Sequence, residues 1–353
     1  MDKLTAIQFG ATVGEIASQS DCVIFQSDQM YTFDGQIYCC IDQQFPKDCA
    51  VPFKLLKDAI GKVTKNSTVE IIPGDNSLVL KRNTSRSLSE TTIPYKTEIL
   101  AQVQAIPALT EADLFFPFPS DIVDNIDSLE SVIDKTQQGT VLYYIHFTVP
   151  FVEAANMEHC VRITLNPTPQ YPTTFPQHAL IPAGYLGKIH KLSTLESFLF
   201  KNDWMYIKTT DDIRYAFPVI TDTSYVDAAV LQNSLYPTDT GIPLILPPEL
   251  ADEVATGMKF SDNGVAHIAV AANPDSTEAS GTLELEMHNV TARHRATIQC
   301  DVVPSATNSI KIAIHGHIIA KIAKGDSPSV TIHENAVIGS YGNVRYAVST
   351  LTT

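Results

Sequence analysis

The sequence has few of the features that a disulfide scaffold, a membrane protein or a secreted protein requires. Its six cysteines include no Cys-x-x-Cys pair, so we expect reduced, buried thiols in an intracellular protein. No apolar run approaches the roughly 20 residues of a membrane span, and the first residues do not form a secretory pattern. We therefore expect a cytoplasmic protein with no membrane partner.

Positive charge is also scarce. The chain has 24 Lys and Arg residues against 39 Asp and Glu residues, a net charge of −15. This balance excludes a protein that coats nucleic acid with a uniformly basic surface, but it leaves room for a local basic patch. With 44% hydrophobic residues in 353 positions, the chain can form two or three folded domains.

Signatures of catalysis are missing as well. The sequence contains no Gly-rich phosphate loop, no Gly-x-Ser-x-Gly and no His-Glu-x-x-His. His315 and His317 would share one face of a predicted strand, but no third metal ligand can be placed beside them. Cys39 and Cys40 are expected on opposite faces of a strand, and Trp204 is expected to pack on a sheet. We therefore expect no enzyme, no catalytic residue, no metal site and no cofactor.

What the sequence does contain is one unit in three copies. Residues 213–217 (Ile-Arg-Tyr-Ala-Phe) and 344–348 (Val-Arg-Tyr-Ala-Val) lie 131 positions apart. A short strand that runs into a lysine-bearing helix recurs at 49–63, 179–191 and 312–324, again close to 130 residues apart. Self-similarity at a fixed period indicates a repeated structural unit.

Each unit is predicted to run helix, strands, helix, strands, an α+β domain with its helices on one face of an antiparallel sheet. The first helix of each unit is predicted at 11–19, 120–136 and 248–260. Proline-rich linkers near 107 and 236 separate the units. The sequence therefore predicts three similar domains, at 1–107, 108–236 and 237–353.

The second helix of each unit carries lysines away from its apolar side. The net charge is +3 over 51–65 and +2 over both 181–191 and 314–324. If the three units place these helices on one surface, their ammonium groups form a field for phosphates that does not depend on sequence. The alternative is an ordinary solvated helix face. The lysines are Lys54, Lys57, Lys62, Lys65, Lys188, Lys191, Lys321 and Lys324.

This arrangement resembles the beta sliding clamp of bacterial-type DNA replication, over essentially all of residues 1–353. The resemblance implies that two chains close head-to-tail into a six-domain ring, with the second-helix lysines facing duplex DNA in the hole. It implies that edge strands of units one and three pair between the chains. It also implies an apolar pocket in which a DNA polymerase and the clamp loader dock short peptides. Carried over by position, that pocket would draw on Val161, Arg162, Pro237, Ile242, Ala347, Val348 and Leu351.

Two features depart from the clamp pattern. Segment 121–135 carries a net charge of −4 on a helix that would border the hole, and the C-terminus lacks the usual Met-Pro-rich tail. A divergent clamp, such as a phage clamp, would fit both. We therefore predict a processivity factor that tethers a DNA polymerase. Two alternatives stay open: a clamp-fold scaffold that binds proteins without encircling DNA, and a viral structural protein rich in β-structure.

Overall fold

The computed structural model describes residues 22–26, 28–33, 36–42, 44–60, 67–100, 109–110, 112–166, 171, 176, 178–221, 241–273, 280–303, 309–324 and 328–351. The helix predicted at 11–19, Lys62, Lys65, Pro237 and both predicted domain boundaries lie outside these residues. By packing, the chain forms two compact units. Unit 1 comprises 1–123, 172–176 and 184–221, and unit 2 comprises 124–171, 177–183 and 222–353.

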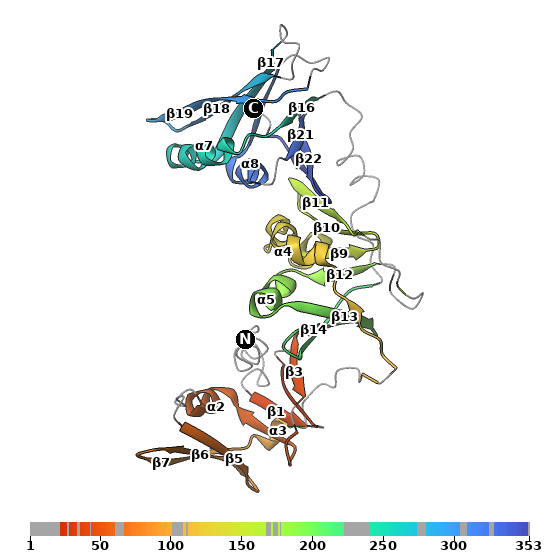
Figure 1. Cartoon of the computed structure of the whole chain (residues 1–353), viewed down its shortest axis with the longest axis vertical. Helices are drawn as coiled ribbons and strands as arrows, with labels where there is room; N and C mark the ends of the chain where they lie inside the picture. Colours follow the sequence, from red (N-terminus) through yellow and green to blue (C-terminus); the bar gives the residue numbers. More distant parts are fainter. Residues whose placement is uncertain are drawn as a thin grey trace. The chain divides into compact units, whose positions relative to one another are not determined.

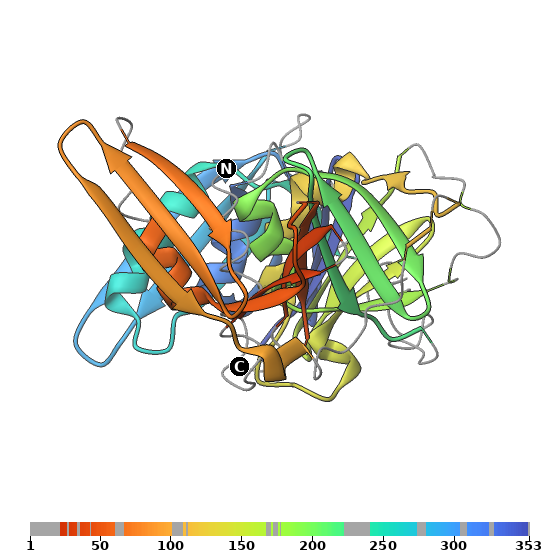
Figure 2. The ribbon, with the colours of Figure 1, turned by 90° about the horizontal axis from the view of Figure 1, so that it is seen from below.

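Unit 1 is built on an eight-stranded antiparallel sheet in the order β4-β1-β2-β3-β15-β14-β13-β8. Its strands are β1 (Cys22–Gln26), β2 (Gln29–Phe33), β3 (Tyr38–Asp42), β4 (Cys49–Pro52), β8 (Phe116–Pro117), β13 (Leu195–Lys201), β14 (Trp204–Thr209) and β15 (Ile213–Pro218). Helices α2 (Phe53–Ile60), α3 (Thr97–Leu100) and α5 (Tyr185–Leu192) complete it. A second sheet of β5 (Ser67–Pro73), β6 (Ser77–Thr84) and β7 (Leu88–Pro94) forms a twisted ribbon (Figure 2).

Unit 2 repeats this plan, with a sheet in the order β12-β9-β10-β11-β23-β22-β21-β16. Its strands are β9 (Tyr144–Thr148), β10 (Phe151–Ala155), β11 (His159–Thr164), β12 (Ala179–Pro182), β16 (Ile242–Ile245), β21 (Ser329–Ile332), β22 (Ala336–Tyr341) and β23 (Val344–Ser349). A second sheet, β19-β18-β17-β20, comprises β17 (Val265–Ala272), β18 (Gly281–His288), β19 (Arg293–Cys300) and β20 (Ser309–His315). The helices are α4 (Ser120–Val132), which begins in unit 1, α7 (Glu249–Gly257) and α8 (Gly316–Ala323), with short 3-10 turns η1 (Val141–Tyr143) and η2 (Met258–Phe260).

Each eight-stranded sheet consists of two four-stranded halves joined at one antiparallel seam. The seams are β3–β15 and β11–β23, and each uses the repeated pentapeptide in the same way. Tyr215 stands opposite Cys39, and its equivalent Tyr346 stands opposite Val161. The predicted α+β architecture of repeated helix-and-sheet copies is therefore confirmed.

Helices α2, α4, α5, α7 and α8 cover one face of the sheets (Figure 1), which we call the helix side; the opposite face is the outer side, where α3 packs through Ile99 and Leu100. Helical spacing in the sequence predicts that Leu186, Ile189 and Ile319 face the sheets, and this is confirmed, since all three are at most 1% exposed. The same spacing predicts that Leu55 faces the sheet, but Leu55 is 47% exposed, because Phe53 and Leu56 take the buried side of α2. No described helix is both long and apolar enough to cross a bilayer.

Two further local predictions are wrong. His317 does not lie on a strand with His315, because β20 ends at His315 and the helix α8 begins directly after it. The run Val141–Thr148 is predicted from the sequence to be a strand, but the strand starts at Tyr144, after one 3-10 turn. Cys39 and Cys40 do lie on opposite faces, as predicted: Cys40 packs in the outer-side apolar cluster and Cys39 opposes Tyr215 on the helix side.

Candidate nucleic-acid interface and partner pocket

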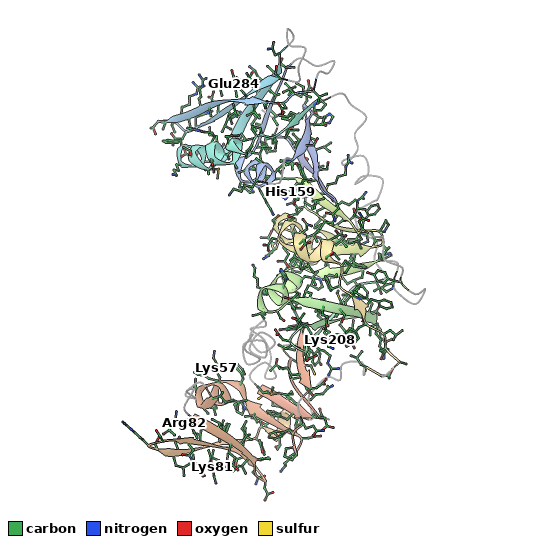
Figure 3. The ribbon with its side chains drawn as sticks, viewed as in Figure 1. Lys57, Lys81, Arg82, His159, Lys208 and Glu284 are labelled. Carbon is green, nitrogen blue, oxygen red and sulfur yellow. The ribbon has the colours of Figure 1, made fainter. Side chains whose placement is uncertain are left out.

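The described lysines of the predicted DNA-facing set all lie on the helix side. Lys54 and Lys57 come from α2, Lys188 and Lys191 from α5, and Lys321 and Lys324 from α8. All are exposed except Lys57, which is half-buried with its ammonium 6.0 Å from the centroid of the Phe53 ring (Figure 3). Each of these helices therefore carries cationic groups that solvent, or a polyanion, can reach.

Lys321 differs from the other lysines because its ammonium group contacts another helix. Its Nζ donates to the backbone carbonyl of Asp127, at 3.2 Å, and to the hydroxyl of Ser131, both on α4. Loss of water around this ammonium lowers its pKa, although the nearby Asp127 carboxylate acts in the opposite direction. Lys321 thus ties α8 to the acidic helix, and Asp124 and Asp127 of α4 are themselves exposed. The helix side of unit 2 carries both signs of charge.

The outer side of unit 2 has a cavity of about 640 Å³ over the β11–β23 seam, which we call the outer pocket. Strand alternation puts Ala155, Cys160 and Ala347 on this side, opposite the face that packs on the helices. Met157, which is 82% exposed, and Glu158 form its rim in the turn between β10 and β11. Small apolar side chains in the floor and a large exposed one at the rim are typical of a site for an apolar peptide.

The same place in unit 1 is filled. Trp204 begins β14 as Ala336 begins β22, and its ring lies 5.7 Å from that of Tyr38 across the seam. The chain's own segment after β7 adds Leu100 and Phe115 to this outer-side cluster. The packing role expected for Trp204 is therefore confirmed. At the β11–β23 seam the smaller Ala336 stands in the place of Trp204 and lines the outer pocket.

The structure distributes the residues predicted for the partner pocket over several places. Ala347 lines the outer pocket, Val161 faces the helix side, and Val348 borders both the outer pocket and a cavity on the helix side. Ile242 is buried in β16. Leu351 pairs with Ala313 through an isolated bridge.

Sequence reasoning missed several lining residues, including Ala155, Met157 and Ala336. Two of them lie in or beside the β10–β11 turn. Such a turn can be predicted from a sequence. That it borders a cavity cannot, because the cavity forms only where β11 pairs with β23. Arg162, the remaining predicted residue, is buried on the outer side, where it forms part of an ion pair.

That ion pair is the centre of a buried charged network on the outer side. The Arg162 guanidinium donates to Glu153 Oε2 through Nε at 2.8 Å and Nη2 at 2.7 Å, and His146 Nδ1 lies 3.2 Å from Oε1. Glu153 is only 5% exposed. Burial raises the pKa of its carboxyl, but the hydrogen bond from His146 and the charge of Arg162 outweigh burial and hold the pKa below its ordinary value. The carboxylate is therefore held ionised between two partners.

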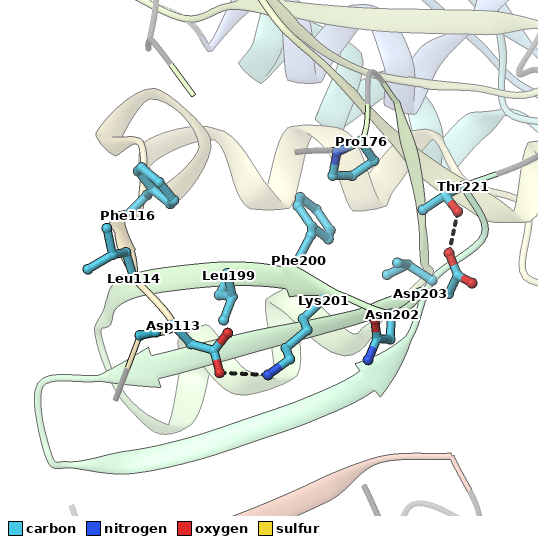
Figure 4. A pocket seen from close by; sticks show the side chains of 12 residues that line it. Asp113, Leu114, Phe116, Pro176, Leu199, Phe200, Lys201, Asn202, Asp203 and Thr221 are labelled. Carbon is cyan, nitrogen blue, oxygen red and sulfur yellow. Dashed lines mark hydrogen bonds and ion pairs between the residues drawn. The ribbon is translucent and has the colours of Figure 1, made fainter. Parts of the chain in front are cut away.

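A further hollow of about 550 Å³ lies in unit 1 (Figure 4). Its charged side chains are paired within its walls: Lys201 Nζ lies 2.6 Å from Asp113 Oδ2, and Thr221 donates to Asp203. The hydrogen bond from Lys201 helps to lower the pKa of Asp113. Because these charged side chains already have partners in the wall, the hollow is a poor candidate site for a charged ligand.

Histidines do not form a metal centre in the described part of the chain. No group of three or more His, Cys, Asp or Glu there is placed to hold an ion. The rings of His315 and His317 are 5.7 Å apart, and His315 Nε2 faces Glu158 Oε2 at 3.6 Å.

Comparison with known proteins finds no match by sequence but several matches by structure. Neither a scan against protein-family models nor a search of curated protein sequences finds a match. Solved structures do match: the DNA polymerase III subunit beta of Pseudomonas aeruginosa gives a TM-score of 0.79 at 12% identity, covering 100% of this chain and 97% of that one. The Helicobacter pylori beta clamp in complex with 3,4-difluorobenzamide gives 0.79 at 12% identity, covering 99% and 96%. The H. pylori beta clamp bound to a DNA ligase peptide gives 0.75 at 12% identity, with the same coverage.

These matches run from one end of both chains to the other, so the likeness concerns the whole architecture and not one domain. The chain therefore has the fold of the DNA polymerase III beta sliding clamps, and the resemblance stated from its sequence is confirmed at the level of the fold.

Proposed function

We propose that this protein is a DNA sliding clamp, a cytoplasmic, non-enzymatic processivity factor with three domains at 1–107, 108–236 and 237–353. The observation that carries the proposal is the clamp fold over the whole chain, with lysines on the helix side of every copy. A closed ring raises the local concentration of its polymerase at the primer end without gripping DNA tightly. An acidic body with restricted basic patches suits such weak, sliding contact.

Two edge strands, β7 and β19, support a head-to-tail homodimer. β7 and β19 each have one ladder neighbour among the described strands. By position in the repeat, β7 corresponds to β15 and β23, and β19 corresponds to β3 and β11. These are the strands that form the two seams within the chain. Pairing β19 with β7 of a second chain would build a third seam of the same kind and cover two exposed edges.

The internal seams also supply the register of this third seam. Arg162 is opposite Arg345 at one seam, and Cys40 is opposite Arg214 at the other. The corresponding residues on the free edges are Arg295 on β19 and Glu90 on β7. In this register these two residues face each other across the dimer.

Neighbouring strands continue the pattern. Glu90 stands opposite Lys81, with Nζ to Oε2 at 3.9 Å, and Arg295 stands opposite Glu286, with Nε to Oε2 at 2.9 Å. The seam would thus carry a row of four charges of alternating sign, from Lys81 through Glu90 and Arg295 to Glu286. Opposite charges directly across a strand pair stabilise it.

Reversing helix-side charge should weaken DNA binding. The triple variant K54E/K191E/K324E changes one exposed lysine in each copy. We expect at least a tenfold loss of duplex affinity at low salt, and a salt slope shallower by about 0.9 for each phosphate that is no longer neutralised. Fluorescence anisotropy over a salt series measures both.

The matched control is K208E. Lys208 lies on the outer side of β14, beside Glu196. Its reversal changes the net charge of the chain by the same amount as the reversal of one helix-side lysine. The helix side itself is left unchanged. Equal losses for K208E and for a single helix-side reversal would contradict the helix-side assignment.

We propose that the outer pocket receives the short peptides of a DNA polymerase and a clamp loader. Its apolar floor and its position over the β11–β23 seam support this, and the H. pylori beta clamp is known bound to a DNA ligase peptide. Ala347 and Val348 from the sequence-based set belong to this pocket, together with Ala155, Met157 and Ala336. One seam of each chain is open in this way and the other is filled.

Filling the outer pocket should abolish peptide binding. The variant A336W copies what Trp204 does at the equivalent position of unit 1, so the fold already tolerates this side chain in such a place. We expect the affinity for a fluorescent peptide from the cognate polymerase to fall at least tenfold, with the dimer intact. E284W, an exposed outer-side position on β18 (Figure 3), is the control and should bind normally. Unchanged binding by A336W would move the peptide site elsewhere.

A second candidate function is a clamp-fold scaffold that binds proteins without encircling DNA. The exposed carboxylates of Asp124 and Asp127 on the helix side favour it, because they would repel phosphates. Retention on nicked circular DNA, with release after linearisation, distinguishes the two functions. A protein that dissociates equally from both templates is a scaffold.

A further inference from the structure

A second cavity of unit 2, about 280 Å³, opens on the helix side between α4, α8 and the β11–β23 seam. We call it the helix-side pocket. Its floor is apolar: Val161, Ile318 and Val344 are 2–8% exposed. Lys321 and Lys324 of α8 stand among its exposed lining residues. The pocket therefore combines a buried apolar floor with two cationic groups at its mouth.

The two cations at the mouth form no ion pair within the described part of the chain. No carboxylate among the described residues lies within 4.0 Å of the ammonium of Lys321 or of Lys324, in a chain whose net charge is −15. Asp127 accepts from Lys321 through its backbone carbonyl, with its carboxylate farther away, and Glu158 faces His315. An anion at the mouth would therefore meet two ammonium groups that form no direct ion pair with a described carboxylate.

Two further groups in the pocket leave hydrogen-bonding capacity unused. The hydroxyl of Tyr346 and Nδ1 of His159 are buried and have no hydrogen-bond partner among the described residues, and both side chains line the pocket. Burial, then the neighbouring His317 and Lys321, lowers the pKa of His159 to about 4. A negative charge bound here would relieve that repulsion, so the pKa of His159 would rise on binding.

We propose that the helix-side pocket binds an apolar group that carries a carboxylate, with the apolar body on the floor and the carboxylate between Lys321 and Lys324. The donor count favours a carboxylate over a phosphate. An ammonium has three N–H donors, and Lys321 already uses two of them on α4. The pocket contains no arginine to clasp a third or fourth oxygen. The argument for this binding does not rest on the proposed clamp function, because every contact lies within one unit of one chain, although Lys321 and Lys324 also belong to the lysine set proposed to face DNA.

The test uses the full-length protein and 3-phenylpropionate, with 3-phenylpropionamide as the neutral isostere. We expect the acid to bind with a Kd on the order of 1 mM. The amide should bind about fivefold more weakly, because an exposed ion pair contributes little more than that factor. Side-chain NMR of His159 should show its pKa rising with the acid but not with the amide. Equal binding of acid and amide, or no shift at His159, overturns the proposal.

Two variants separate charge from shape. K321M/K324M should bind acid and amide equally, whereas K311M, an exposed lysine on β20, should keep the fivefold preference. S131W should block the mouth and remove binding of both, and since Ser131 is exposed the fold should persist. Retained acid preference in K321M/K324M contradicts the proposed orientation.

Further probes identify the source of the carboxylate. A tripeptide that ends in phenylalanine binds more tightly than 3-phenylpropionate if the pocket reads a protein C-terminus, and more weakly if it reads a free organic acid. Phenyl phosphate tests the competing chemistry. If phenyl phosphate binds more tightly than the acid, the pocket is a phosphate site and the proposal is wrong.

Discussion

Replacing Arg295 by glutamate will weaken the proposed head-to-tail dimer about 30-fold and shift its equilibrium toward monomer. The substitution puts two carboxylates opposite each other at the proposed β19–β7 seam, in place of an attractive pair. Reversal at one cross-strand pair costs about 1 kcal/mol. A head-to-tail ring has two identical seams, so the dimer loses about 2 kcal/mol, roughly a 30-fold change in Kd. Sedimentation velocity over a concentration series measures the shift.

Mixing variants turns this result into a test of both topology and register. E90R alone should also dissociate, because the introduced guanidinium would then meet Arg295 of the second chain. In a one-to-one mixture of R295E and E90R, a head-to-tail heterodimer has two different seams. At one seam the introduced glutamate of R295E faces the introduced arginine of E90R. At the other seam the original Arg295 faces the original Glu90. Both seams therefore pair opposite charges, so we expect the mixture to dimerise where each variant alone does not. An isologous dimer, or a register shifted by two residues, does not give this rescue.

The matched control is K311E, a reversal of an exposed charge on β20. β20 lies at the other edge of the β19-β18-β17-β20 sheet, so K311E should dimerise like the unchanged protein. R295E that stays dimeric, or a mixture that stays monomeric, would remove the proposed seam.

Much of the fold could be predicted from the sequence, because it is repeated. The pentapeptides at 213–217 and 344–348 mark the last strand of a copy, and strand alternation then follows from local pattern. Helix faces were harder to predict: Leu55 looks like a core residue in an amphipathic segment, yet Phe53 and Leu56 reach the sheet first. The exposure of one position depends on tertiary contacts that a single helix does not encode.

The candidate site was less accessible to sequence reasoning. Val161 and Arg162 are neighbours, so strand alternation sends one to the helix side and the other to the outer side. Whether a seam holds a cavity depends on pairs from distant copies. Trp204 and Ala336 hold equivalent positions, but only the packing around each distinguishes a filled seam from an open one.

The seam charges show the same limit. Arg295 lies in a predicted strand, Glu90 lies in a segment where no strand is predicted from the sequence, and no local pattern relates the two residues. Their proposed pairing follows only from the registers of β3–β15 and β11–β23, which the structure supplies. A sequence with internal repeats can thus predict which strands are equivalent before it can predict how they align.

Replacing Glu153 by glutamine will cause the largest loss of stability that we expect from one substitution. The carboxylate is 5% exposed and Arg162 is 6% exposed, and their oxygen and nitrogen atoms lie 2.7 Å apart. Removing one partner of a buried ion pair leaves the other charge uncompensated and costs about 3–5 kcal/mol. Arg345 stands opposite Arg162 on β23, so the loss also leaves two guanidinium-bearing residues side by side. Thermal unfolding followed by circular dichroism measures the change.

Two companion variants assign the loss to uncompensated charge. E196Q removes an exposed carboxylate that lies 4.0 Å from Lys208, and should change stability by less than about 1 kcal/mol. The double variant E153Q/R162M removes both buried charges and should regain much of the stability lost by E153Q. A double variant less stable than E153Q would mean that Arg162 stabilises the sheet by packing against the Phe151 ring, 4.7 Å away, and not through its charge.

The effect of Glu153 should depend on pH with a definite sign. Because His146 and Arg162 hold its pKa below the ordinary value in the folded protein, the ionised carboxylate contributes its full stability above the unfolded-state pKa of about 4.3. That contribution is lost as pH falls through the lower folded-state pKa. The difference in unfolding temperature between the unchanged protein and E153Q should therefore be constant from about pH 7 to about pH 5 and shrink below about pH 4. A difference that grows on acidification would mean that burial dominates and that the folded carboxyl is protonated more readily than the unfolded one.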